Sequence, residues 1–119
     1  MKRRTREEAV RLWVTALRSG EYKQAQEQLR TTDSFCCLGV VCDLAAKDGG
    51  PQWTEFNEVD KFMGESVQLP GVVAEFLSPG YSERLNKEGS NFFDQLAWMN
   101  DMGASFTELA AMIEKELLP

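Results

Sequence analysis

Apolar residues recur at helical spacing along much of the chain, and the longest apolar run lies at residues 35–46. This run is too short to span a bilayer, which takes about 20 apolar residues. Gly39 and the β-branched pair Val40 and Val41 permit a strand. The length of the run and its Ala45-Ala46 ending favour a helix, one that is apolar on nearly all sides and therefore buried.

Two capping boxes mark the ends of the chain as helical. Thr5 is followed three residues later by Glu8, and Ser105 by Glu108, so each hydroxyl and carboxylate can satisfy backbone N–H groups of a first helical turn. Apolar stripes at i, i+3, i+4 and i+7 spacing follow both boxes. Weaker apolar faces predict further helices over 21–30, from Pro70 to Gly80, and over 91–101. Ser34 is the expected N-cap of the central helix.

The pattern is least regular over residues 48–70 and 81–90. Trp53 and Phe56 are isolated aromatics that belong either to the core or to an exposed binding platform. A short helical turn is expected at Val59, Phe62 and Met63, followed by a brief strand at Val67 and Leu69. Residues 81–90 form either a loop or a small hairpin. The fold class predicted is mainly α: a compact single domain, residues 1–119, with a bundle of about five or six helices and at most a small β element between residues 52 and 90.

The three cysteines lie within the central apolar run. On a helix, Cys36, Cys37 and Cys42 point in three directions and cannot converge on one metal ion. The chain also lacks histidine. We therefore interpret the cysteines as buried small apolar residues, expect no cofactor and no metal, and expect Cys36, on a narrow polar seam with Asp43 and Lys47, to be the thiol most open to reagents.

The absence of histidine excludes Ser-His-Asp and Cys-His catalytic arrangements. Neither a dinucleotide-binding nor a P-loop glycine motif occurs. Paired carboxylates remain, but their spacing does not distinguish them from solvated charge, so we expect a protein that is not an enzyme. The basic start of the chain runs directly into Glu7 and Glu8 without the apolar core of a signal peptide, which favours a cytoplasmic protein with reduced thiols and no membrane association.

Charge is divided unevenly along the chain. Residues 1–30 carry eight Lys or Arg and four Glu, a net charge of +4, whereas residues 31–119 carry a net charge of −10. An acidic body suits a protein partner with a basic surface, and the basic start could contact nucleic acid. The candidate partner-binding residues are Glu55, Glu58, Asp60, Glu65, Glu83 and Glu88. The candidate nucleic-acid-binding residues are Arg3, Arg4, Arg6 and Arg11.

Two stretches carry a resemblance to a known family. The run F-C-C-L-G-V-V-C-D-L at 35–44 and the segment from Leu96 to Ile113, which contains Asn100-Asp101-Met102-Gly103, resemble motifs of small uncharacterised proteins encoded by bacteriophages and prophages. Ala16-Leu17-Arg18-Ser19-Gly20, Tyr22 and Leu69-Pro70 also correspond, so the resemblance covers most of the chain. It implies a phage or prophage origin and a role directed at a bacterial host, and it supplies no catalytic residue.

Two functions follow as expectations. The first is a non-catalytic protein that binds a host macromolecule, for example by inhibiting a defence system through its acidic surface. The alternative is a small nucleic-acid-associated accessory protein that uses the basic N-terminal helix. The Asn100-Asp101-Met102-Gly103 motif is interpreted as a corner between two helices, because Asn and Asp bond local backbone and Gly takes positive φ. A functional site on Asn100 and Asp101 is the other interpretation.

Overall fold

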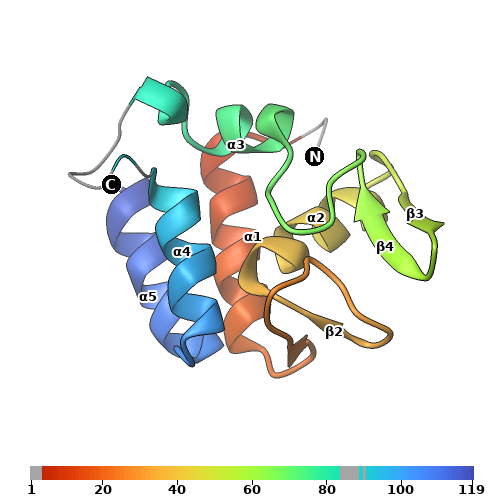
Figure 1. Ribbon diagram of the computed structural model, residues 1–119. Helices are drawn as coiled ribbons and strands as arrows, with labels where there is room; N and C mark the ends of the chain where they lie inside the picture. Colours follow the sequence, from red (N-terminus) through yellow and green to blue (C-terminus); the bar gives the residue numbers. More distant parts are fainter. Residues whose placement is uncertain (1–3, 84–88, 90) are drawn as a thin grey trace.

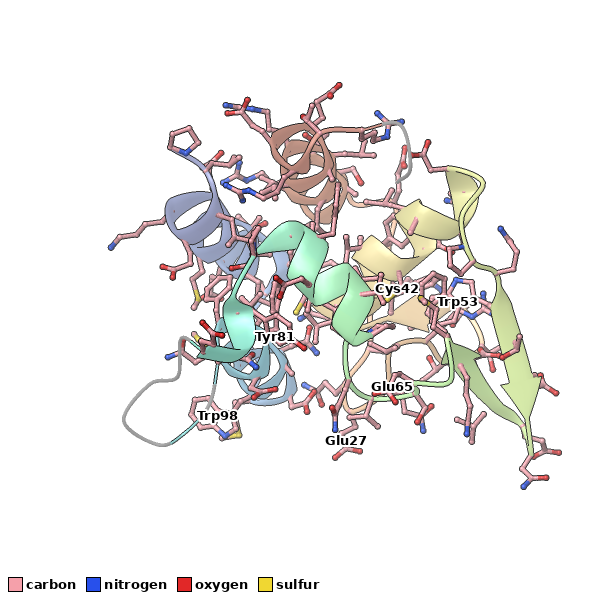
Figure 2. All side chains as sticks on the ribbon, turned by 90° about the horizontal axis from the view of Figure 1, so that it is seen from above. Glu27, Cys42, Trp53, Glu65, Tyr81 and Trp98 are labelled. Atoms are coloured by element: carbon pink, nitrogen blue, oxygen red, sulfur yellow. The ribbon has the colours of Figure 1, made fainter. Side chains whose placement is uncertain are left out.

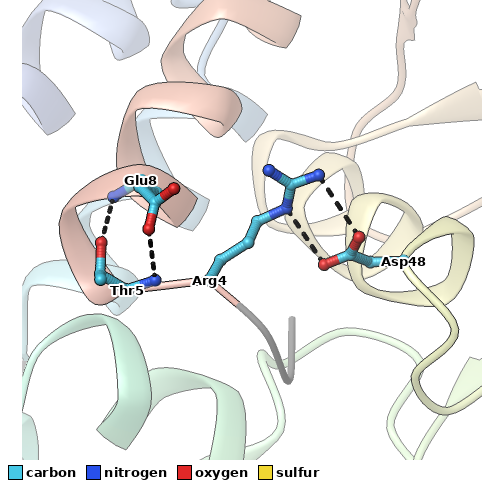
Figure 3. Close-up of polar contacts among 4 residues, drawn as sticks. All are labelled: Arg4, Thr5, Glu8 and Asp48. Carbon is cyan, nitrogen blue, oxygen red and sulfur yellow. Dashed lines mark hydrogen bonds and ion pairs between the residues drawn. The ribbon is translucent and has the colours of Figure 1, made fainter.

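The computed structural model describes residues 4–83, 89 and 91–119. Its first helix, α1 (Arg6–Arg18), packs against α5, α2 and α3 (Figure 1). The predicted capping box is confirmed. The Glu8 N–H donates to the Thr5 hydroxyl at 3.1 Å, and the Thr5 N–H donates to the Glu8 carboxylate at 3.0 Å (Figure 3). The helix buries the apolar stripe Ala9, Val10, Trp13, Val14 and Leu17.

The helix predicted over 21–30 is wrong. This segment instead contains β1 (Lys23–Gln24), which pairs in parallel with β2 (Ser34–Phe35). Its backbone bonds reach distant residues: the Ala25 N–H donates to Phe35 O and the Leu29 N–H donates to Ser66 O, each at 2.7 Å. The apolar face of the segment was too weak to stabilise a helix against these tertiary bonds.

The buried central helix is confirmed as α2 (Cys37–Lys47). Its N-cap is Cys36, whose Sγ accepts the Gly39 N–H at 3.4 Å, and not the predicted Ser34, which lies in β2. The prediction that the cysteines are buried is also confirmed. Helix α2 is anchored to α1 by the Trp13 indole, which donates to Cys37 O at 2.9 Å.

A hairpin follows α2, formed by β3 (Trp53–Phe56) and β4 (Val59–Phe62) in antiparallel pairing. The helical turn predicted at Val59, Phe62 and Met63 and the strand predicted at Val67 and Leu69 are both wrong. The loop residues Asn57 and Glu58 have φ of 52° and 64°, the combination of positive angles that a type I′ turn requires. Such a turn usually contains glycine, and its absence here concealed the hairpin in the sequence.

Three helices complete the described fold. They are α3 (Gly71–Leu77), which follows Pro70 as predicted, α4 (Phe92–Asp101) and α5 (Phe106–Leu117). The second predicted capping box, at Ser105 and Glu108, is confirmed. Within 81–90 the structure describes the 3-10 helix η1 (Tyr81–Glu83), and most of the loop or hairpin predicted there lies outside the described residues.

Arg6 ties two of these helices together. Its guanidinium donates from Nη1 to Leu77 O at 3.1 Å and to Leu117 O at 2.9 Å, so one cation satisfies carbonyls at the ends of α3 and α5. The coarse prediction of a mainly α fold with small β elements is confirmed. The β1–β2 pair, however, lies outside the 52–90 window to which β structure was assigned. No helix among the described residues has the length and apolar composition needed to cross a membrane.

Candidate functional site, an acidic cleft beside the hairpin

The structure brings together three of the six acidic residues that the sequence suggested. Glu55, Glu58 and Asp60 line a cleft of about 380 Å³ between the β3–β4 hairpin and residues 28–32. Glu65 lies beyond β4, where its backbone pairs with Phe62, and Figure 2 shows it at the same edge as Glu27. Glu83 belongs to η1, away from the cleft, and Glu88 lies outside the described residues.

The hairpin holds two carboxylates of the cleft opposite each other. Glu55 on β3 is the register partner of Asp60 on β4. Like charges in directly opposite positions destabilise a sheet. Arg30 offsets part of this repulsion, because its Nε donates to Asp60 Oδ2 at 3.0 Å in a pair whose side chains are only 26% and 15% exposed.

Arg30 also contacts an aromatic row beneath the cleft. The row runs from Tyr22 through Phe35 and Trp53 to Phe62, with ring centroids 5.0, 6.1 and 5.1 Å apart. The Arg30 guanidinium lies over Trp53, with its Cζ 4.4 Å from the ring centroid. Figure 2 shows Trp53 between the hairpin and α2. Trp53 thus packs against the core as well as against a surface cation, while the Phe56 side chain is outside the described part of the structure.

A buried carboxylate fixes this row to α2. Asp43, 8% exposed, accepts the Tyr22 hydroxyl at 2.7 Å and the Trp53 indole N–H at 3.1 Å, and pairs with Lys47 at 3.3 Å. Burial, followed by the hydrogen bond to Asp43, raises the pKa of the Tyr22 phenol. The hydrogen bond to Tyr22 is the main reason why the pKa of Lys47 is raised. The sequence pattern places Asp43 only on a helix seam and gives no sign of its two aromatic partners, Tyr22 and Trp53.

Glu55 and Glu58 differ from Asp60 in having no partner. Both are exposed, and neither carboxylate makes a hydrogen bond or ion pair with any other described residue. Arg30, by contrast, is engaged by Asp60 and Trp53. The cleft therefore presents two carboxylates to solvent on one side of a cation that is already bound.

The N-terminal arginines are engaged by the protein itself. Arg4 donates to both carboxylate oxygens of Asp48, at 3.1 and 3.3 Å (Figure 3), and this contact lowers the pKa of Asp48. Arg6 bonds the carbonyls described above, and Arg11 pairs with Glu7 at 3.4 Å. Arg3 lies outside the described residues. Each of these three described arginines thus has a partner within the protein, although Arg11 stays 60% exposed.

Cys36 is the least buried of the three thiols, in line with its predicted rank, but it is not open to reagents. Its side chain is 4% exposed, and burial raises the pKa of the thiol to about 11. Burial also raises the pKa of Cys37 and of Cys42 well above the usual value. Cys36 lies on the seam as predicted, but the N-cap role turns its sulfur toward the Gly39 N–H. Among the described residues, no three Cys, Asp or Glu side chains are grouped to hold a metal ion.

We expect all three thiols of the native protein to resist Ellman's reagent near neutral pH. The thiolate is the reactive form, and with a pKa of about 11 only about one Cys36 in a thousand is ionised near pH 8. After denaturation all three should react at the rate of free cysteine. Rapid labelling of one thiol in the native protein would contradict the burial of Cys36.

Residues 1–117 match the model of a family described as a domain of unknown function. No curated protein and no solved structure matches the chain.

Proposed function

The chain belongs to the DUF8296 family, and we propose that it is a non-catalytic protein that binds a basic partner surface in the acidic cleft. The phage or prophage origin and the host target expected from the resemblance of residues 35–44 are part of this proposal. The observation that carries it is the pair of exposed carboxylates, Glu55 and Glu58, left without partners beside the bound cation of Arg30.

The conformation of Glu58 supports the same proposal. Its φ of 64° lies in the left-handed region, where a side chain costs about 1–2 kcal/mol relative to the right-handed region. Glycine would fit the turn without this cost. Strain at a particular residue is commonly found where the residue serves a function. The strained position places a carboxylate in the wall of the cleft.

Electrostatics also favour a basic partner. The region after residue 30 carries a net charge of −10, so a cationic surface is attracted before contact is made. Complementary charge of this kind raises the association rate more than the final affinity, and salt screens it. The nucleic-acid alternative has less support, because Arg4, Arg6 and Arg11 are engaged by Asp48, by helix carbonyls and by Glu7.

The test measures binding of a fluorescent oligoarginine peptide by anisotropy, with a labelled DNA duplex in parallel. We expect salt-sensitive binding of the peptide and none of the duplex. Glu55→Gln and Glu58→Gln should each weaken peptide binding about two- to fivefold, the range of an exposed charge pair. Glu83→Gln is the matched control, because it removes one charge from a residue outside the cleft. Equal losses in all three variants, or preferential binding of the duplex, would refute the proposal.

Glu58→Gly separates binding from stability. Glycine relieves the strain of the positive φ, so the free energy of unfolding should rise by up to about 1 kcal/mol. The midpoint of thermal unfolding should rise with it. Binding of the peptide should fall as it does in Glu58→Gln. A variant that gains stability and keeps full binding would show that the Glu58 carboxylate has no role in the cleft.

A further inference from the structure

We propose that Arg30 occupies, in the free protein, the position that an arginine side chain of the partner takes on binding. The inference rests on the proposed function and specifies which basic group the cleft receives. It also assigns Arg30 a regulatory role, since the partner has to displace the protein's own guanidinium from Asp60 and Trp53. The guanidinium site on Asp60 and Trp53 is thus occupied by an internal competitor until a basic partner arrives.

The geometry around Arg30 is that of a bound guanidinium ligand. One face of the group lies over the Trp53 ring at 4.4 Å, and its Nε–H donates to Asp60 Oδ2 at 3.0 Å. The same cleft contains Glu55 and Glu58, for which no cation is provided among the described residues. One cation therefore shares the cleft with three carboxylates. Once Arg30 is displaced, an incoming guanidinium finds the face of Trp53 and the Asp60 carboxylate already arranged around a group of its own shape.

The contacts favour arginine over lysine. A guanidinium is planar, so it can stack on an indole and donate hydrogen bonds in its own plane at the same time. An ammonium group can make the ion pair but does not stack. Two contacts that do not involve Arg30 hold Trp53 in place. Its indole N–H donates to the buried Asp43, and its ring packs against Phe62. The aromatic surface therefore stays in position when Arg30 leaves.

The exchange needs Arg30 to move and little else. Its side chain reaches the cleft from the irregular segment between β1 and β2 and contacts Asp60 and Trp53. Displaced from them, the guanidinium enters solvent near Thr31 and Thr32, which line the same cleft. Each contact that Arg30 loses is replaced by an equivalent contact with the partner. The net gain in binding free energy therefore comes from Glu55 and Glu58.

The test compares Arg30→Met with Arg18→Met for binding of the oligoarginine peptide and of an oligolysine peptide. Methionine keeps an unbranched apolar side chain and removes the guanidinium. Arg18 pairs with Glu114 at 3.2 Å on the α1–α5 face, so its replacement makes the same change in net charge away from the cleft. We expect Arg30→Met to bind oligoarginine about three- to tenfold more tightly than Arg18→Met, with a smaller gain for oligolysine.

A second measurement keeps the inference testable if Arg30→Met is poorly folded. In the wild-type protein, the side-chain Nε–H resonance of Arg30 should shift on addition of oligoarginine as its bond to Asp60 is lost. The inference is overturned if that resonance does not move, or if Arg30→Met is folded and binds no more tightly than Arg18→Met. Wild-type binding that depends on Glu55 and Glu58 would then still support the proposed function. Absence of peptide binding in every variant would overturn both.

Discussion

Replacing Gly39 with alanine is expected to destabilise the fold by at least about 3 kcal/mol, at or above the upper end of the range for overpacked cores. A Cβ at this position would lie 1.7 Å from the carbonyl oxygen of Leu29 and 2.6 Å from its carbonyl carbon. Both atoms belong to the backbone, so no change of rotamer relieves the clash. Either α2 or the segment around Leu29 would have to shift. Chemical denaturation followed by circular dichroism measures the loss.

Gly71→Ala is the matched control for this substitution. Gly71 is the first residue of α3, and a Cβ there meets only the Tyr81 hydroxyl, at an ordinary 3.5 Å. Alanine has the higher helix propensity, so we expect the free energy of unfolding to change by less than about 1 kcal/mol. If Gly39→Ala were as stable as Gly71→Ala, the close packing of α2 on Leu29 would be wrong.

The sequence predicted those elements whose signals are local. The capping boxes at Thr5 and Ser105 and the apolar stripes that follow them fix α1 and α5 from within a few residues. The segment 21–30 could not be predicted in the same way. Its backbone bonds end on Phe35 and Ser66, and no local pattern encodes those partners. The hairpin was missed because its turn uses Asn57 and Glu58 where glycine is usual.

In the candidate site, too, the features that depend on residues close in sequence could be predicted, and the contacts between distant residues could not. Glu55, Glu58 and Asp60 are close in sequence, so their selection as one acidic group needed no knowledge of the fold. Arg30 lies 30 residues before its partner Asp60, and Tyr22 lies 21 residues before Asp43. Contacts over such separations depend on how α2 and the hairpin pack. Arg4 and Arg6 were predicted from the sequence to bind nucleic acid. In the structure Arg4 instead pairs with Asp48, and Arg6 donates to carbonyl groups at helix ends.

Asn100 lies in the predicted corner between two helices, but its side chain bonds residues far from that corner. The corner between α4 and α5 is present, with Gly103 at a φ of 105°. Yet Asn100 is fully buried, and its amide reaches across the molecule. Its Nδ2 donates to Ala25 O at 2.7 Å, and its Oδ1 accepts the Cys37 N–H at 3.2 Å and the Gln24 amide at 2.9 Å. The side chain therefore joins α4 to the irregular segment and to the start of α2.

Asn100→Ala should destabilise the protein by about 3–5 kcal/mol. The substitution leaves the Ala25 carbonyl and the Cys37 N–H without their partner, and each unsatisfied buried group costs about 1–3 kcal/mol, to which the new cavity adds. Asn91→Ala, which removes the N-cap of α4 at the surface, should cost only about 1 kcal/mol. Denaturant unfolding of both variants compares them directly. Equal losses would show that Asn100 acts only within the corner between α4 and α5, whereas the expected difference would assign it to the packing of three segments.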